Sequence, residues 1–201
     1  MRRALRCGVA GLAVAVAAMG SAHAERYTID ASHSTVGFKI KHLAISSVPG
    51  RFGDFTGMID FDPTKIADSS VEATIKTESI NTDNKKRDDH LRGADFFDGS
   101  KNPTIQFKTT KVEPVSASTF KATGDLTMRG ITKPVTLDVE YTGGATDPWG
   151  NKRVGFSAST VLSRKDFGIT WNKTLDAGGL VLGDEVKVTL EIEGIEEKKA
   201  G

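Results

Sequence analysis

The densest group of residues that could do chemistry runs from Lys85 to Arg92 and holds four basic residues, two aspartates and one histidine. Hydrogen bonds from Arg87, His90 and Arg92 could hold an anionic or polar head group at the rim of a binding site. The alternative is a solvent-exposed helix with internal charge pairs, because runs of charge usually face water. A third interpretation makes His90 a general base, but no nucleophile stands near it in the sequence.

Other enzyme motifs are weak. His33, His42 and His90 stand far apart in the sequence, so the spacing typical of a metal site is missing. His33 and His42 fall at predicted strand ends and are interpreted as surface or turn residues. The run Gly155–Ser159 begins like a nucleophile elbow but lacks its closing glycine. We therefore expect no catalytic residue, no metal site and no cofactor.

The N-terminal segment predicts export. A basic start, Met1–Arg6, precedes an uncharged run from Val9 to Met19, and small residues occupy both positions that a signal peptidase reads before Glu25. The apolar run is too short for a comfortable membrane span. We expect cleavage between Ala24 and Glu25 and delivery of the mature chain to the periplasm.

The mature chain, residues 25–201, is expected to form one domain. It keeps 24 basic and 26 acidic residues, a formal charge of −2, because the leader removes three of the 27 basic residues and none of the 26 acidic ones. This balance offers no positive field for nucleic acid, so no nucleic-acid partner is expected. The single cysteine, Cys7, leaves with the leader, which excludes disulfides and thiolate catalysis in the mature domain.

Strand patterns fill the mature chain. Apolar and polar residues alternate with a period of two in eight or nine segments, as in Val186–Ile192, and turn residues such as Gly143-Gly144 separate them. The one helical pattern runs from Asn84 to Gly93, with Asp83 as its expected cap and Gly93 as its end. Asp88 and Arg92 are spaced to pair on that helix. An antiparallel barrel or sandwich follows, and periodicity does not separate the two.

Several positions on the apolar faces carry small residues, namely Gly57, Ala73, Ala122, Gly124 and Ala158. Small residues on an inward face leave room for a ligand inside a barrel of about eight strands. Alternatively, large residues opposite them interdigitate and fill that space. The sequence leaves both interpretations open.

Ordered motifs along the mature chain resemble the YceI-like family of exported polyisoprenoid-binding proteins. The most specific motif is KRDDHLRGADFF, which begins at Lys86. The other matching segments are Tyr27–Asp30, Gly37–Leu43, Phe52–Asp62, Pro103–Phe107, Gly124–Val135, Arg164–Gly168 and Gly179–Val188. The stretch Ser46–Gly50 departs from the family pattern at Pro49 and is interpreted as a loop.

The resemblance implies an all-β, lipocalin-like antiparallel barrel of about eight strands, with one short helix near residues 84–93 and an apolar interior that takes a long lipid tail. Arg87, His90 and Arg92 are the expected head-group residues. The expected tail-binding residues are Phe38, Ile40, Phe55, Ile59, Phe61, Ile75, Phe107, Phe120, Leu126, Leu137, Val139, Phe156, Ala158 and Leu162.

Three functional hypotheses follow. The favoured one is a periplasmic protein that binds an isoprenoid lipid of the quinone or prenyl phosphate type for transport, storage or sequestration. The second is an enzyme acting on a lipid head group, which a requirement for His90 would support. The third is a filled barrel that serves as a stress-response or interaction module. The expected partner is a long-chain lipid, without stable membrane insertion, and a homodimer is left open.

Overall fold

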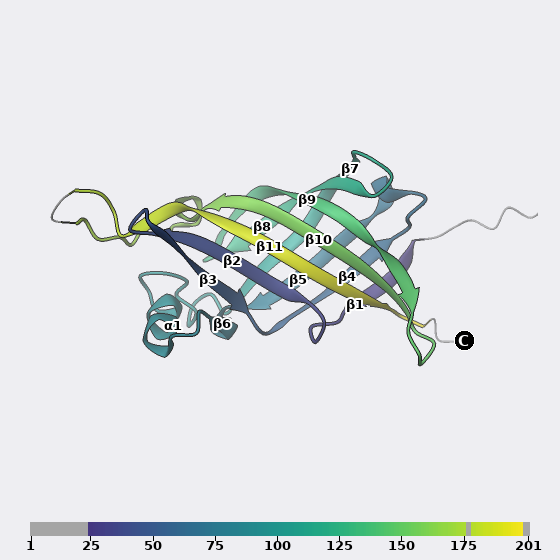
Figure 1. Ribbon diagram of the computed structural model, residues 1–201, viewed down its shortest axis with the longest axis horizontal. Coiled ribbons are helices and arrows are strands. Elements are labelled where there is room, and N and C mark those ends of the chain that lie inside the picture. Colours follow the sequence, from purple (N-terminus) through teal and green to yellow (C-terminus); the bar gives the residue numbers. More distant parts are fainter. Residues whose placement is uncertain (1–23, 176–177, 199–201) are drawn as a thin grey trace, which may run out of the picture.

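The computed structural model describes residues 24–175 and 178–198, which form a β-barrel with a short helix beside one end (Figure 1). The predicted leader comprises residues 1–24, and its first 23 residues lie outside the described residues. The helix is α1 (Lys85–Arg92). The strands are β1 (Glu25–Ile29), β2 (Thr35–His42), β3 (Ser46–Phe52), β4 (Phe55–Phe61), β5 (Ser70–Lys76), β6 (Ile80–Asn81), β7 (Thr104–Pro114), β8 (Thr119–Met128), β9 (Ile131–Thr146), β10 (Lys152–Ser163) and β11 (Leu182–Glu196).

Eight strands close the barrel, which confirms the predicted fold class and decides against a sandwich. Their order is β1–β4–β5–β7–β8–β9–β10–β11, and β11 pairs again with β1. Every one of these pairings is antiparallel. Strand β2 pairs with the first part of β11, and β3 extends the sheet beyond β2. Among the described residues, no helix is both long enough and apolar enough to cross a membrane.

The alternating pattern positions the interior. In β11, Val186, Val188, Leu190 and Ile192 point into the barrel, whereas the intervening Lys187 and Glu191 are exposed. This arrangement follows from strand geometry, because successive side chains lie on opposite faces of a sheet. A barrel with one apolar face per strand therefore gathers its apolar side chains inside.

Two interpretations of local sequence are wrong. Ser46–Gly50 belongs to β3 and is not a loop. Pro49 is tolerated because, among the described strands, only β6 pairs with the outer edge of β3, and it does so only at Arg51 and Phe52. Gly143-Gly144 is not a turn either. Strand β9 continues through it with a bulge opposite Gly155, and the chain reverses at residues 147–150.

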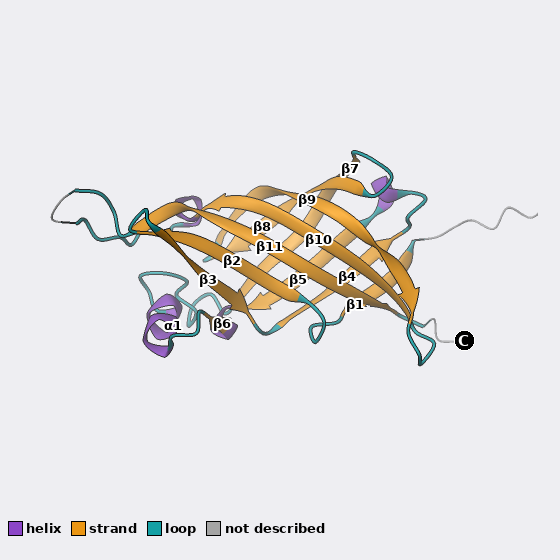
Figure 2. Ribbon diagram, in the orientation of Figure 1, coloured by secondary structure: helices purple, strands orange, loops and turns teal. Residues whose placement is uncertain are grey.

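Helix α1 lies outside one end of the barrel (Figure 2) and ends at Gly93 as predicted. Its cap is Asn84, not Asp83, because the Asn84 side chain accepts a hydrogen bond from the Arg87 N–H. The expected pairing of Asp88 with Arg92 is also wrong. Asp88 is buried and accepts hydrogen bonds from Thr82, which ties the helix to the end of β6.

Candidate functional site

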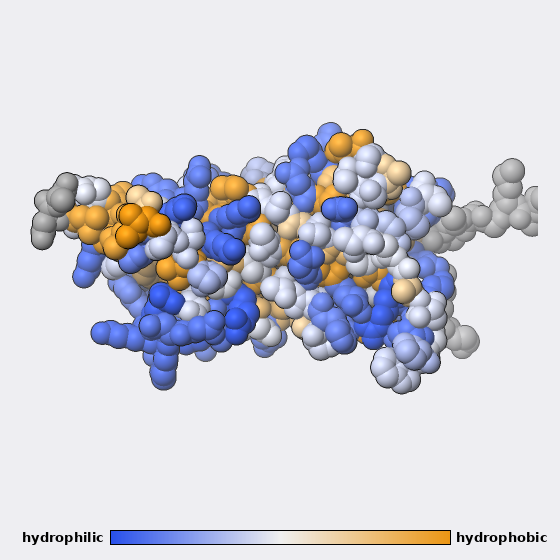
Figure 3. Space-filling model, viewed as in Figure 1, coloured by the Kyte–Doolittle hydropathy of each residue, from blue (hydrophilic) through white to orange (hydrophobic). Residues whose placement is uncertain are grey.

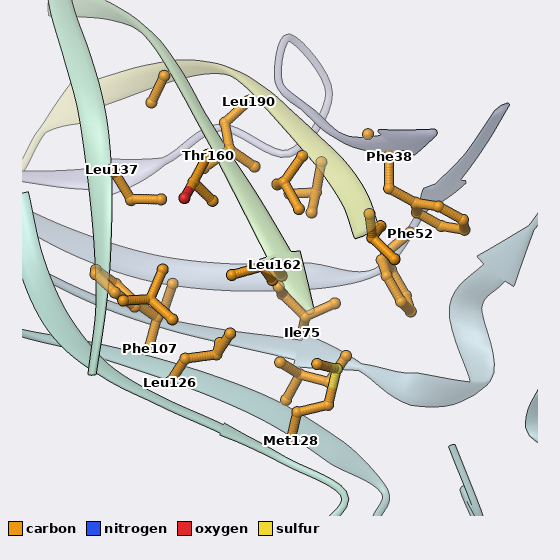
Figure 4. A pocket seen from close by; sticks show the side chains of 18 of the residues that line it. Phe38, Phe52, Ile75, Phe107, Leu126, Met128, Leu137, Thr160, Leu162 and Leu190 are labelled. Carbon is orange, nitrogen blue, oxygen red and sulfur yellow. The ribbon is translucent and has the colours of Figure 1, made fainter. Parts of the chain in front are cut away.

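An apolar cavity of about 560 Å³ runs inside the barrel and reaches the end beside α1. In the close view of its wall, the side chains are hydrocarbon except for the hydroxyl of Thr160 and the sulfur of Met128 (Figure 4). Labelled residues from opposite sides of the barrel, such as Leu126 on β8 and Leu190 on β11, face the same space. A wall with so few hydrogen-bonding groups favours an apolar occupant.

All fourteen predicted tail-binding residues line this cavity. They come from β2, β4, β5, β7, β8, β9 and β10, so the alternation in each strand was enough to find them. His42, interpreted as a surface or turn residue, also lines the cavity at the end of β2 and is only partly exposed.

The small residues on the inward faces divide into two groups. A side chain at Gly57 would collide with Ile29, and one at Gly124 would collide with the Phe107 ring, so neighbours fill the space beside both glycines. The alanines 73, 122 and 158 instead line the cavity. Large neighbouring side chains therefore fill the space beside the two glycines, whereas the space beside the three alanines is open to a ligand.

Aromatic rings plug the end of the barrel opposite α1. The centroid of the Phe61 ring lies 4.8 Å from that of Tyr141 and 4.9 Å from that of Phe156, and Phe120 lies 6.5 Å away. Phe61 is only 1% exposed. Burial and a hydrogen bond to Glu25 raise the pKa of the nearby Tyr27 hydroxyl well above its usual value, so it stays neutral. This end is closed by packed side chains.

A network of charges surrounds the same closed end. The Arg153 guanidinium lies 2.9 Å from a carboxylate oxygen of Asp30 and 2.9 Å from one of Asp147, and it also donates to Glu193. Hydrogen bonds from Ser32, His33 and Arg153 hold the pKa of Asp30 below its usual range. Asp30 is therefore ionised over the whole physiological pH range.

Asp30, His33 and Glu193 offer ligand atoms that lie within 4.8 Å of one another, a grouping that sequence spacing could not reveal because it joins two distant segments. Arg153 donates hydrogen bonds to both carboxylates of this group. The His33 ring nitrogen lies 2.7 Å from Asp30. The described contacts thus make this cluster a salt-bridge network.

At the α1 end, Arg87 and His90 line the cavity, as expected of head-group residues. The Arg87 Nε donates to Thr82 Oγ1 at 2.7 Å, and one Nη donates to the Thr82 carbonyl at 2.6 Å. These two bonds use only part of a guanidinium that carries five N–H groups. Within the described residues Arg87 forms no ion pair, so N–H groups remain for a ligand.

Arg92, the third expected head-group residue, does not line the cavity. It donates to the carbonyls of Glu78 and Ile80 at 2.9 and 2.8 Å and pairs with Asp89. Its guanidinium therefore ties α1 to the start of β6 and to the residues just before it. The structure separates the two arginines that the sequence grouped together.

Aromatic residues at the mouth were not selected from the sequence. The His90 ring packs edge to face against two rings. Its centroid lies 5.0 Å from that of Phe96 and 5.1 Å from that of Trp171. The neighbouring Phe97 packs edge to face on Phe52 of β3, with ring centroids 5.8 Å apart. The only available signal was that Phe96 and Phe97 end the same motif that contains Arg87.

Arg164 is the other residue that sequence reasoning missed. It lines the cavity, is 3% exposed and donates to the carbonyls of Gly183, Ile169 and Trp171. It also pairs with Asp184 at 3.2 Å. Hydrogen bonding from Lys165, together with the Arg164 charge, lowers the pKa of Asp184. Two separate sequence motifs thus meet here to shape the segment around Trp171.

Comparisons with known proteins agree with this architecture. The model of the YceI-like domain matches residues 27–194. A UPF0312 protein of Pseudomonas aeruginosa is 42% identical over 180 residues, which cover 89% of this chain and 91% of that protein. The solved structure of the Campylobacter jejuni YCEI protein is 38% identical, with a TM-score of 0.68 over 84% of this chain and 96% of that one.

A more distant structure shares the fold. The polyisoprenoid binding domain from Saccharophagus degradans is 16% identical, with a TM-score of 0.60 over 85% of this chain and 98% of that one. The family model covers most of the present chain, and the curated relatives match it nearly end to end. The chain belongs to the YceI-like family.

Proposed function

We propose that this protein binds a long isoprenoid lipid, with the tail inside the barrel and the head group at the mouth beside α1. The observation that carries the proposal is the apolar cavity, closed by aromatic packing at one end and bordered by Arg87 and His90 at the other. The polyisoprenoid-binding description of the Saccharophagus degradans domain supports the same ligand class.

Burial of the tail supplies the binding free energy. Each buried CH₂-sized unit contributes roughly 0.8 kcal/mol. Several isoprene units would together exceed the observed limit of about −18 to −21 kcal/mol for non-covalent binding. Ordering of the tail and incomplete burial offset much of this gain. Affinity therefore needs no polar contact, and the head-group residues set orientation and selectivity.

The head group we propose is anionic or strongly hydrogen-bonding, as in a prenyl phosphate or a quinone. Arg87 supports this choice because it borders the cavity with N–H groups that Thr82 does not use. We further propose that the protein acts by binding and not by catalysis, and that it works in the periplasm after cleavage before Glu25. Its role there is transport, storage or sequestration.

Filling the cavity tests the proposal. Ala158 lies on β10 beside Val139 and Leu190, both of which line the cavity. In Ala158→Trp, the added ring occupies space that the tail needs, so we expect lost binding of a prenyl alcohol and a near-normal free energy of unfolding. The matched control is Val161→Trp on the same strand, because Val161 is 57% exposed and should tolerate the ring.

Denaturant unfolding and lipid mass spectrometry of the purified variants measure the two effects. In a close-packed core, the same substitution would cost about 1 to 3 kcal/mol. A destabilised Ala158→Trp, together with a parent protein that extracts no lipid from membranes, would refute the proposal and favour the filled-barrel interaction module.

A further inference from the structure

The mouth of the barrel carries an exposed apolar tip. It is formed by Ala44 and Ile45 in the turn between β2 and β3 and by Leu180 just before β11, and Ile45 and Leu180 are 83% and 46% exposed. A shallow surface depression joins Ala44 to Leu180. Figure 3 shows hydrophobic residues gathered at this end of the molecule. We call Ala44, Ile45 and Leu180 the apolar tip.

The backbone of the tip is unusual for its sequence. Leu43 and Ala44 have φ angles of 53° and 58°, and the Ile45 N–H donates to the His42 carbonyl at 3.2 Å, which makes a tight turn of two left-handed residues. Such turns strongly favour asparagine and glycine. In this protein the two left-handed positions are occupied by Leu43 and Ala44, and the exposed Ile45 follows them. Strained backbone of this kind is found preferentially at functional sites.

The tip is fixed to the mouth of the cavity. The Leu43 N–H donates to the Val181 carbonyl at 2.8 Å, which ties the β2–β3 turn to the segment that leads into β11. Leu182 lines both the surface depression and the cavity. The exposed apolar side chains therefore border the opening through which a lipid would pass.

Cations frame the tip. Lys41 lines the surface depression, and Lys173 bonds through its carbonyl to the Val181 N–H. The depression is also lined by Asp184, whose carboxylate is paired with Arg164 and Lys165. Within the described residues, neither the Lys41 nor the Lys173 ammonium group forms an ion pair with a carboxylate. At the closed end, by contrast, Lys152 contacts Glu25 and Glu196 at 2.7 and 3.0 Å. Free positive charge beside exposed apolar side chains complements an anionic lipid surface.

We propose that the apolar tip docks on an anionic bilayer, so that the lipid moves between membrane and barrel without crossing water. The inference rests on the proposed lipid-binding function, since the tip borders the mouth of the same cavity. Ile45 and Leu180 insert among the lipids, and Lys41 and Lys173 face the anionic head groups. A protein partner on the same surface is the competing explanation.

The experiment compares two pairs of substitutions. Ile45→Asp with Leu180→Asp removes the tip, and Val115→Asp with Trp149→Asp makes the same charge change at two other exposed apolar residues, which are 66% and 78% exposed. Phosphatidylglycerol–phosphatidylcholine vesicles carry geranylgeraniol, and its transfer to each protein is followed by mass spectrometry of the recovered protein. Melting temperatures of both variants should match that of the parent.

We expect transfer to the tip variant to slow by about tenfold, the equivalent of about 1.4 kcal/mol, and transfer to the control variant to change little. Transfer to the parent should slow when salt is raised or when phosphatidylglycerol is omitted. Equal rates for the two variants would overturn the proposal. An unchanged rate for the tip variant would overturn it as well and would point to a protein partner.

Two further measurements separate this proposal from the proposed function. Geranylgeraniol added from solution should bind equally to the parent and the tip variant, and failure of the parent to bind it would count against lipid binding itself. Co-sedimentation with vesicles that lack geranylgeraniol tests docking alone. If the parent sediments no better than the tip variant, docking is refuted whatever the cavity binds.

Discussion

The two ends of this barrel are built from the same strands, but one end is closed by packing and ion pairs and the other is open. At the end near β1, Phe61 is enclosed by three aromatic rings, and Arg153 is paired with three carboxylates. At the end near α1, aromatic side chains line an opening, and Arg87 keeps unused N–H groups. Saturated packing and pairing stabilise the first end, and incomplete pairing leaves the second able to bind.

The two ends of the barrel also differ in how their strands are joined. At the closed end, residues 147–151 join the long strands β9 and β10, and β1 completes the ring by bonding to both β4 and β11. At the mouth, β2 and β3 extend the sheet beyond β11, and Arg164 donates to the carbonyls of Ile169 and Trp171 in the segment that follows β10. Binding residues are found disproportionately on connecting segments that a rigid scaffold positions.

The largest expected effect of a single substitution is at the closed end. Phe61→Ala removes a ring that is 1% exposed and contacted on several sides, so the free energy of unfolding should fall by about 3–5 kcal/mol. Trp171→Ala at the mouth should cost less, because Trp171 is only half-buried, while speeding lipid release. Urea denaturation measures both losses, and equal losses would show that the mouth is packed like the plug.

A smaller effect should separate the two arginines of the mouth. Arg87→Gln removes charge-assisted bonds to an anionic head group, so prenyl phosphate binding should weaken by about 1.5 to 3 kcal/mol. A prenyl alcohol should be affected much less. Arg92→Gln leaves the carbonyls of Glu78 and Ile80 without their donor, so it should lower stability and leave the ligand preference unchanged. If Arg87→Gln weakened the binding of both ligands equally, Arg87 would support the structure of the mouth and would not contact the head group.

The different fates of Arg87 and Arg92 show how far the sequence could lead. Alternation predicted an antiparallel all-β fold and the cavity-lining residues, because the period of a strand fixes which side chains face inward. The choice of a barrel over a sandwich came from the resemblance to the YceI-like family. Alternation could not place Arg92, since the carbonyls that hold it belong to residues 78 and 80, outside its own helix. Arg164 was missed for the same reason, because three of its four partners are backbone carbonyls, which carry no sequence signal.

The smallest expected effect concerns the cap of α1, which holds the wall of the mouth in place. Asn84 accepts the Arg87 N–H at 3.0 Å, so Asn84→Ala should cost about 1 kcal/mol of helix stability. Global unfolding should change little, because α1 lies outside the barrel. Amide hydrogen exchange in α1 should accelerate, and a bound prenyl phosphate should dissociate faster, because Arg87 is held by that first turn.

Asn84→Asp provides the matched control, since aspartate caps helices about as well as asparagine and should restore slow exchange. Asp83→Asn should have no such effect, because Asp83 precedes the cap and has a left-handed backbone, with φ of 59°, that asparagine also tolerates. If Asp83→Asn accelerated exchange in α1 and Asn84→Ala did not, residue 83 would be the cap. In that case the geometry of the mouth described above, with Arg87 fixed through Asn84 and Thr82, would be wrong.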